Sequence, residues 1–124
     1  QLILIPSNRT PKETIIFAKE YFNKSRIIID NIDKKAYLSS LALAKYIVVT
    51  CDSSSMISEA ALTGKPIYVA MIPPMKNDKR FNKFRSLFKD LNIIKELGED
   101  LSSWSYQGLN ETQRVASIIK EKLK

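Results

Sequence analysis

Short apolar runs alternate with longer amphipathic segments along this chain. Leu2 to Ile5 is one such run, ended by Pro6, and its length is that of a buried strand. The other runs are equally short and rich in β-branched residues, which favours strands over helices. The pattern predicts strands over residues 2–5, 26–30, 46–51, 67–70 and 92–94.

Helix-start and helix-stop signals occupy the intervals between these runs. Thr10, Pro11 and Glu13 form a capping-box sequence, with a hydroxyl at N-cap, proline at the first helical position and a carboxylate at the third. Gly64, followed by Pro66, is a typical helix stop. The predicted helices cover residues 11–22, 34–45 and 56–62, a basic segment with Phe81, Phe84 and Phe88 at helical spacing, and a last segment capped at Asn110, whereas residues 97–109 are expected to be irregular.

Strands that alternate with helices predict an α/β fold. Continuous apolar strands are typical of a parallel sheet with both faces covered, so we expect a Rossmann-like, doubly wound sheet with helices on both faces. A length of 124 residues is that of one ordinary domain, and we assign residues 1–124 to a single Rossmann-like domain.

The composition excludes several kinds of chemistry. The chain has no histidine, which removes an imidazole base, a Ser-His-Asp triad and histidine metal ligands. Its one cysteine, Cys51, can form neither an intramolecular disulfide nor a zinc site alone, and we expect a small buried residue at a strand end. We therefore expect no metal and no cofactor, and we name no catalytic residue.

The charge of the chain favours anionic partners. Twenty Lys and Arg residues against 13 Asp and Glu residues give a formal net charge of +7. Several cations fall in the basic segment around the three phenylalanines: Lys76, Lys79, Arg80, Lys83, Arg85 and Lys89. Such a segment is typical of a core stripe beneath a solvated charged face, and contact with an anionic membrane surface is the alternative. We do not favour nucleic acid, because the aromatic residues fall at core spacing and form no stacking platform.

The start of the chain and its composition bear on its origin. Gln1 stands directly before an apolar run, without the charged n-region of a signal peptide, so we interpret the chain as a piece of a longer protein. No apolar run approaches the roughly 20 residues that span a bilayer. An excess of lysine, isoleucine and asparagine suggests an AT-rich bacterial genome, which predicts a cytoplasmic location, with a peripheral position at the inner membrane as a variant.

Polar residues follow the first predicted strand at its carboxyl end, where parallel sheets bind ligands. Ser7, Asn8, Arg9 and Thr10 lead into a helix start, whose N–H groups and dipole favour an anion. Arg9 can hold a phosphate through two N–H groups. A capped turn with a solvated Arg9 explains the same residues equally well, and no glycine-rich phosphate loop decides between the two.

A second polar segment follows the central predicted strand. Asp52 and three consecutive serines, Ser53, Ser54 and Ser55, open a helix that carries Glu59. Hydroxyl and N–H groups of the first turn can hold a diphosphate, and the Glu59 carboxylate can accept hydrogen bonds from ribose hydroxyls. The alternative is that the serines and Asp52 only cap the helix.

Residues 46–69, with the sequence YIVVTCDSSSMISEAALTGKPIYV, closely resemble the signature VVTxDSxSMxSEAxxTGKPVY of the mitochondrial fission (elongated mitochondria) family. Residues 7–11 resemble its SRRTP turn, residues 37–50 its PYxxxLALADxIVVT run and residues 104–112 its closing WxYxPLNET segment. Bacterial members resemble glycosyltransferases of the GT-B type, in which two Rossmann-like domains face each other across a cleft. The resemblance implies that this chain is the C-terminal, nucleotide-sugar-binding half.

The resemblance also implies roles for individual residues. By position, Ser53, Ser54, Ser55 and Met56 face the donor diphosphate and Glu59 faces the ribose, while Arg9 and Thr10 lie in the facing loop. The expected nucleotide-sugar site comprises Ser7, Arg9, Thr10, Asp52, Ser53, Ser54, Ser55, Met56 and Glu59.

The chain departs from the family pattern at three places. Asn8 replaces the first arginine of SRRTP, which weakens the case for a two-arginine phosphate clamp. Gly108 stands where the pattern has proline, and residues 31–36 replace a Gly-Glu-Asn-Pro approach to Tyr37. A more distant likeness to nucleotide-sugar 2-epimerases, through a DSxxxxEEA helix start, keeps half of an epimerase as an alternative.

Two classes of function follow from the resemblance. In the first, the complete protein transfers a sugar from a nucleoside diphosphate, of the UDP type, to an acceptor held by a missing N-terminal domain. This chain then supplies donor binding and has no turnover alone. In the second, the fold is a non-catalytic scaffold for protein or membrane interaction, as the fission role of plant members implies. Binding of a nucleoside diphosphate discriminates between the two, and we favour the first.

Overall fold

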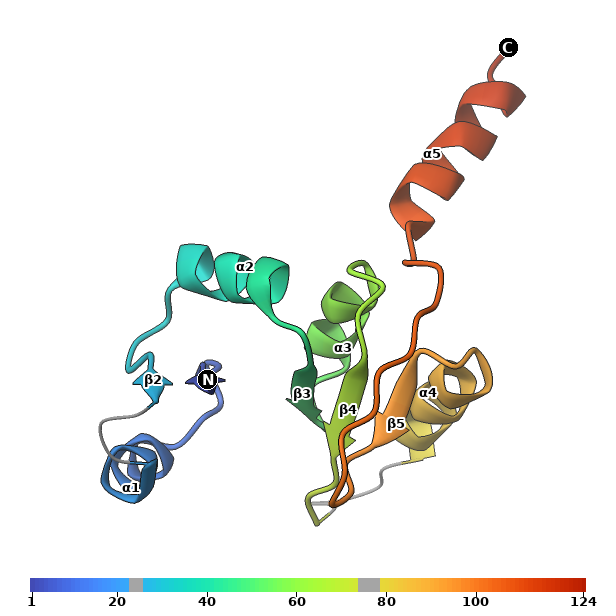
Figure 1. The fold of residues 1–124 in the computed structure, drawn as a ribbon. Coiled ribbons are helices and arrows are strands. Elements are labelled where there is room, and N and C mark those ends of the chain that lie inside the picture. The colour runs from blue at the N-terminus through green and yellow to red at the C-terminus, as the bar shows by residue number, and fades with distance from the viewer. Residues whose placement is uncertain (23–25, 74–78) are drawn as a thin grey trace. The chain divides into compact units, whose positions relative to one another are not determined.

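Helices and strands alternate along the whole chain, as the apolar pattern predicts (Figure 1). The computed structural model describes residues 1–22, 26–73 and 79–124. The elements are β1 (Ile3–Leu4), α1 (Lys12–Phe22), β2 (Ile27–Ile28), α2 (Lys34–Leu43), β3 (Ile47–Thr50), α3 (Ser54–Ala61), β4 (Ile67–Ala70), α4 (Lys79–Asp90), β5 (Ile94–Glu96) and α5 (Glu111–Lys122). The predicted α/β class is confirmed.

The strands pair in parallel, in two small sheets. The chain divides into unit 1, Gln1–Leu43, and unit 2, Ala44–Lys124. In unit 1, β1 pairs with β2, with Ile3 opposite Ile27. In unit 2 the strand order is β3-β4-β5, with Ile47 opposite Ile67 and Ile67 opposite Ile94. The predicted parallel pairing is therefore confirmed, while the assignment of all 124 residues to one domain stays a prediction.

Apolar side chains from the three strands and α3 form the core of unit 2. Ile57, Ile67, Val69 and Ile94 are fully buried. Burial of a side chain of this size stabilises a fold by about 1.5–3 kcal/mol. Successive side chains of β3 point to opposite faces of the sheet, so that Ile47 and Val49 are buried while Val48 between them is exposed. This core fixes the sheet from which the segment after β3 emerges.

The predicted last strand lies two residues too early, and the end of α4 explains the difference. Asn92 has a φ of 57°, the left-handed conformation that ends many helices and that asparagine tolerates. Its N–H donates to the Lys89 carbonyl at 2.9 Å, and the Ile93 N–H donates to the Phe88 carbonyl at 2.9 Å. Asn92 therefore belongs to the helix stop, and β5 begins only at Ile94.

Two other expectations about the second half of the chain are confirmed. Asn110 caps α5, since its side chain accepts a hydrogen bond from the Gln113 N–H at 3.4 Å. Residues 97–109 contain neither helix nor strand. The Tyr68 hydroxyl of β4 donates to the Ser102 carbonyl of this segment at 2.9 Å. Tyr106 donates to the Lys65 carbonyl at 2.8 Å, and burial raises the pKa of its phenol to about 12. Among the described residues, no helix is long and apolar enough to cross a membrane.

Candidate functional site

α3 begins directly after the carboxyl end of β3. The Ser53 N–H donates to the Thr50 carbonyl at 3.0 Å, and this turn carries the chain from the strand into the helix. The Ile57 N–H donates back to the Ser53 carbonyl, also at 3.0 Å. The first N–H groups of a helix have no acceptor within the helix, so this position favours an anion.

Ser53 is a structural residue of this turn. Its side chain is buried, with 6% of its surface exposed, and its Oγ lies 3.3 Å from Thr50 Oγ1. It occupies the N-cap position of α3 but makes no side-chain hydrogen bond that caps the helix. The Ser53 side chain therefore does not cap α3, in contrast to the alternative in which the serines only cap the helix.

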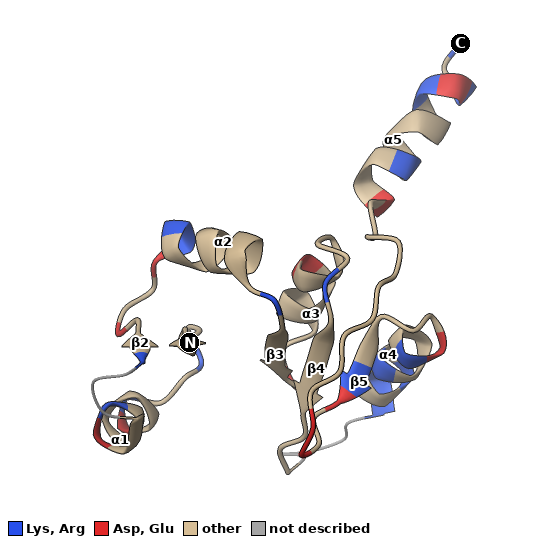
Figure 2. Cartoon of the chain, viewed as in Figure 1, with Lys and Arg blue, Asp and Glu red and all other residues tan. Residues whose placement is uncertain are grey.

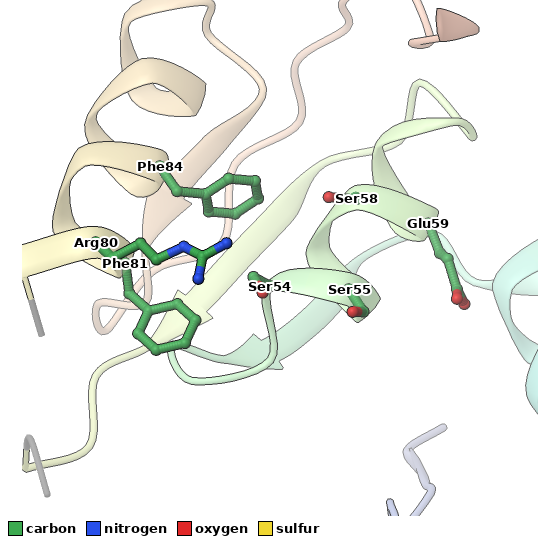
Figure 3. Close-up of a pocket in the computed structure, with 7 residues that line it drawn as sticks. All are labelled: Ser54, Ser55, Ser58, Glu59, Arg80, Phe81 and Phe84. Carbon is green, nitrogen blue, oxygen red and sulfur yellow. The ribbon is translucent and has the colours of Figure 1, made fainter. Parts of the chain in front are cut away.

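A pocket of about 600 Å³ lies between α3 and α4 (Figure 3). Its volume falls within the range of roughly 300–1,000 Å³ that is typical of small-molecule sites. The lining residues are Ser54, Ser55, Ser58, Glu59, Arg80, Phe81 and Phe84. Most of these side chains are exposed, so the pocket is open to solvent.

The two walls of the pocket differ in chemistry. The α3 wall offers three hydroxyl groups and one carboxylate, whereas the α4 wall offers one guanidinium and two aromatic rings. In Figure 3, the Arg80 side chain extends from α4 toward α3 beside the rings of Phe81 and Phe84. The Glu59 carboxylate points away from α4. A ligand with a negative group at one end and hydroxyl groups at the other matches this arrangement.

Of the residues predicted in unit 2, Ser54, Ser55 and Glu59 line this pocket together. Asp52 and Met56 are half-buried and do not line it, and neither does Ser53. The serine-rich segment after β3 thus separates into buried turn residues and residues that face the pocket.

The predicted residues of unit 1 form a turn of their own. The Ser7 N–H donates to Thr10 Oγ1 at 2.9 Å, and the Thr10 N–H donates to the Ser7 carbonyl at 3.0 Å. The Arg9 N–H donates to Ser7 Oγ at 3.2 Å. The side chains of Ser7 and Thr10 therefore stabilise the turn before α1, and Arg9 is exposed beside them.

Four residues that line the pocket were not predicted from the sequence: Ser58, Arg80, Phe81 and Phe84. The available signal was the position of α4, because it is the next helix after β4, just as α3 follows β3. Ligands of parallel sheets bind beyond the carboxyl ends of neighbouring strands. Applied to β4, this rule predicts ligand-binding residues at the start of α4.

The basic segment does not present one solvated face. Arg85 is buried, with 4% of its surface exposed, and it donates to the Cys51 carbonyl at 2.9 Å. Placing Arg85 among solvated cations was therefore wrong, because its guanidinium satisfies a backbone oxygen at the end of β3. Phe88 is a core residue, as predicted, and Cys51 is buried as expected. Lys76 lies outside the described residues.

No group of three Cys, Asp or Glu side chains among the described residues is arranged to hold a metal ion. The pocket contributes one carboxylate, Glu59, and its other polar groups are hydroxyls and a guanidinium. A guanidinium is a permanent cation, and it favours an anionic ligand over a metal.

Parallel strands define the class of this chain as an α/β protein, and its pocket lies beyond β3, at the edge where such sheets commonly bind ligands. The particular family follows from residues 1–123, which match the family described as Mitochondrial fission ELM1. The chain belongs to this family, and the relationship predicted from the signature in residues 46–69 is confirmed.

Two relatives illustrate the relationship. The chain is 38% identical over 125 residues to the uncharacterized protein RP120 of Rickettsia prowazekii (strain Madrid E), covering 95% of this chain and 35% of that protein. It is 34% identical over 122 residues to the mitochondrial fission protein ELM1 of Arabidopsis thaliana, covering 94% of this chain and 28% of that protein. The chain thus spans about a third of the length of the curated relatives it matches. No solved structure matches it.

Proposed function

We propose that the pocket between α3 and α4 binds the nucleoside diphosphate part of a sugar donor. The observation that carries this proposal is that Ser54, Ser55 and Glu59, selected by their position after β3, line one pocket of ligand size. Serine hydroxyls and first-turn N–H groups can donate hydrogen bonds to the oxygens of a diphosphate, and a carboxylate can accept hydrogen bonds from ribose hydroxyls. Three of the residues that the resemblance assigns to the donor therefore line the same pocket of unit 2.

In this proposal the chain stabilises the group that leaves the sugar. Cleavage of the bond between sugar and diphosphate places negative charge on the diphosphate, and fixed N–H groups at a helix start stabilise such charge as it develops. The general base that activates the acceptor is not assigned to any residue of this chain. Transfer of a sugar is accordingly an activity of the complete gene product, and the chain alone has no turnover.

The turn in unit 1 is a separate proposal. Ser7 and Thr10 fix its backbone through three hydrogen bonds, and Arg9 is exposed on it. We propose that Arg9 binds a phosphate group. The replacement Arg9→Gln removes the charge and leaves the hydrogen bonds of the turn in place.

Calorimetric titration with UDP, GDP, ADP and CMP tests the donor site. We expect one nucleotide, of the UDP type, to bind saturably to the complete gene product. Glu59→Ala should weaken that binding by roughly tenfold to a hundredfold, because a hydrogen bond to a charged group contributes about 1.5–3 kcal/mol. The double replacement of Ser54 and Ser55 by alanine should weaken it by a similar factor.

Matched controls separate the pocket from general effects of charge and polarity. Glu99→Ala removes an exposed carboxylate of unit 2 that does not line the pocket, and Ser117→Ala removes an exposed hydroxyl on α5. Both should bind the nucleotide as the wild type does. If no nucleotide binds to a protein shown to be folded, the donor proposal fails and the scaffold function takes its place.

A further inference from the structure

Arg80 differs from the other cations of α4. Figure 2 shows that basic residues gather on this helix. Arg85 is buried and donates to the Cys51 carbonyl, and Lys89 lies 3.6 Å from the Glu96 carboxylate. Among the cations of α4, Arg80 is the one that lines the pocket.

Two aromatic rings define the surroundings of the Arg80 guanidinium. Phe84 packs on Phe88 with ring centroids 4.4 Å apart, and Phe88 is a core residue with 7% of its surface exposed. Phe81 is half-buried and lines the same wall. Arg80 itself is exposed, and apolar rings on one side of its guanidinium reduce the contact with water there, which strengthens pairing with an anion that binds on that side. The planar guanidinium also offers two parallel N–H groups, the geometry that matches a phosphate.

The charge of Arg80 has no counterpart among the described ion pairs, which join Lys19 to Asp30, Lys89 to Glu96 and Arg114 to Glu111. The first turn of α4, where Arg80 lies, contains no acidic residue. A cation in the first turn of a helix is disfavoured by the helix dipole, and local rules are broken most often at functional positions. An anion bound in the pocket would offset the unfavourable interaction between the Arg80 charge and the dipole of α4.

We infer that Arg80 binds the diphosphate of the nucleotide and makes the pocket prefer nucleoside diphosphates to nucleosides. This inference rests on the proposed donor site and adds the cation that the site needs. It assigns that cation to α4 of unit 2, whereas the SRRTP-like turn of unit 1 has lost one of its two arginines to Asn8. Glu59 then takes the opposite, ribose end of the ligand.

Titrations of the complete gene product with Arg80→Gln test this inference. The probes are UDP, GDP and ADP, their nucleosides and inorganic pyrophosphate. Arg80→Gln should weaken binding of the preferred diphosphate and of pyrophosphate by roughly tenfold to a hundredfold, and it should change nucleoside binding less than twofold. Lys83→Gln removes the same charge from an exposed position of α4 outside the pocket, so it should change each affinity less than threefold.

The outcomes separate this inference from the donor proposal. Equal loss of diphosphate affinity in Arg80→Gln and Lys83→Gln overturns the role of Arg80 and leaves the donor site standing. Binding of pyrophosphate that depends on Arg80, without binding of any nucleotide, supports Arg80 as a diphosphate ligand and contradicts the nucleotide. If the folded wild type binds neither nucleotides nor pyrophosphate, both proposals are overturned. A urea titration of each variant shows that it is folded.

Discussion

At the scale of single residues, two glycines of unit 2 have very different surroundings. A Cβ atom added to Gly108 would lie 2.6 Å from the Leu62 carbonyl oxygen, closer than real Cβ atoms approach, whereas a Cβ on Gly98 would meet nothing within 4 Å. Beside Gly108, the Leu109 N–H donates to the Ala61 carbonyl at 3.1 Å, so the segment is held against the end of α3. Glycine at 108 permits this approach.

Gly108→Ala should therefore destabilise the protein, because the obstructing atom is a backbone oxygen that cannot move without its helix. We expect the free energy of unfolding to fall by about 1–3 kcal/mol, the usual cost of overpacking. Gly98→Ala is the matched control and should change it by less than about 0.5 kcal/mol. Urea denaturation of both variants measures the difference. Equal stabilities would show that residue 108 does not approach α3 closely.

At the scale of elements, Arg85 connects α4 to the end of β3. Its Nη1 donates to the Cys51 carbonyl at 2.9 Å and its Nη2 to Asn82 Oδ1 at 2.6 Å. β3 leads directly into α3, and α3 forms the opposite wall of the pocket. The hydrogen bond from Arg85 therefore helps to fix the distance between the two walls.

Arg85→Gln should lower the free energy of unfolding, whereas Arg80→Gln is expected to lower the affinity for the ligand. Loss of a buried donor leaves the Cys51 carbonyl without its guanidinium partner, which costs roughly 1–3 kcal/mol of unfolding free energy. Lys83→Gln, on the same helix but exposed, should leave stability within about 0.5 kcal/mol of the wild type. Thermal and urea denaturation check this. Unchanged stability in Arg85→Gln would refute the connection between α4 and β3.

The periodicity of the sequence predicted the elements more reliably than their ends. Each apolar run contains a parallel strand, although β4 is the one described strand whose residues are mostly buried, and the Asn110 cap was readable from local side-chain chemistry alone. The start of β5 could not be read in this way. Asn92 ends α4 in a left-handed conformation, in which the Asn92 N–H donates to the Lys89 carbonyl and the Ile93 N–H to the Phe88 carbonyl. Local residue type did not reveal those partners.

The candidate site was predictable on one wall. Ser54, Ser55 and Glu59 follow a strand directly, so topology alone placed them at its carboxyl end. Arg80 and Phe81 follow β4 only after residues 71–78, and the length of that connection separates them from the strand in sequence. Arg85 was misassigned because burial of a charged side chain depends on an acceptor far away in the sequence, here the Cys51 carbonyl.

At the scale of the whole molecule, membership of the Mitochondrial fission ELM1 family is established and the activity is a proposal. The chain covers 35% and 28% of the lengths of its two relatives. Donor binding by this chain can be tested at the N–H groups that begin α3, because a diphosphate bound there must accept hydrogen bonds from them.

The most direct test of the central claim is an NMR titration of the ¹⁵N-labelled chain with UDP, GDP and ADP, observing backbone amides and arginine side chains. We expect saturable shifts for one of these nucleotides, and we expect the largest shifts at the amides of Ser54, Ser55 and Met56 and at the Arg80 side chain. The amide of Gly98, which does not line the pocket, should be unaffected. Saturable binding with its shifts elsewhere in the chain, or no shifts in a folded chain, would contradict the proposed donor site.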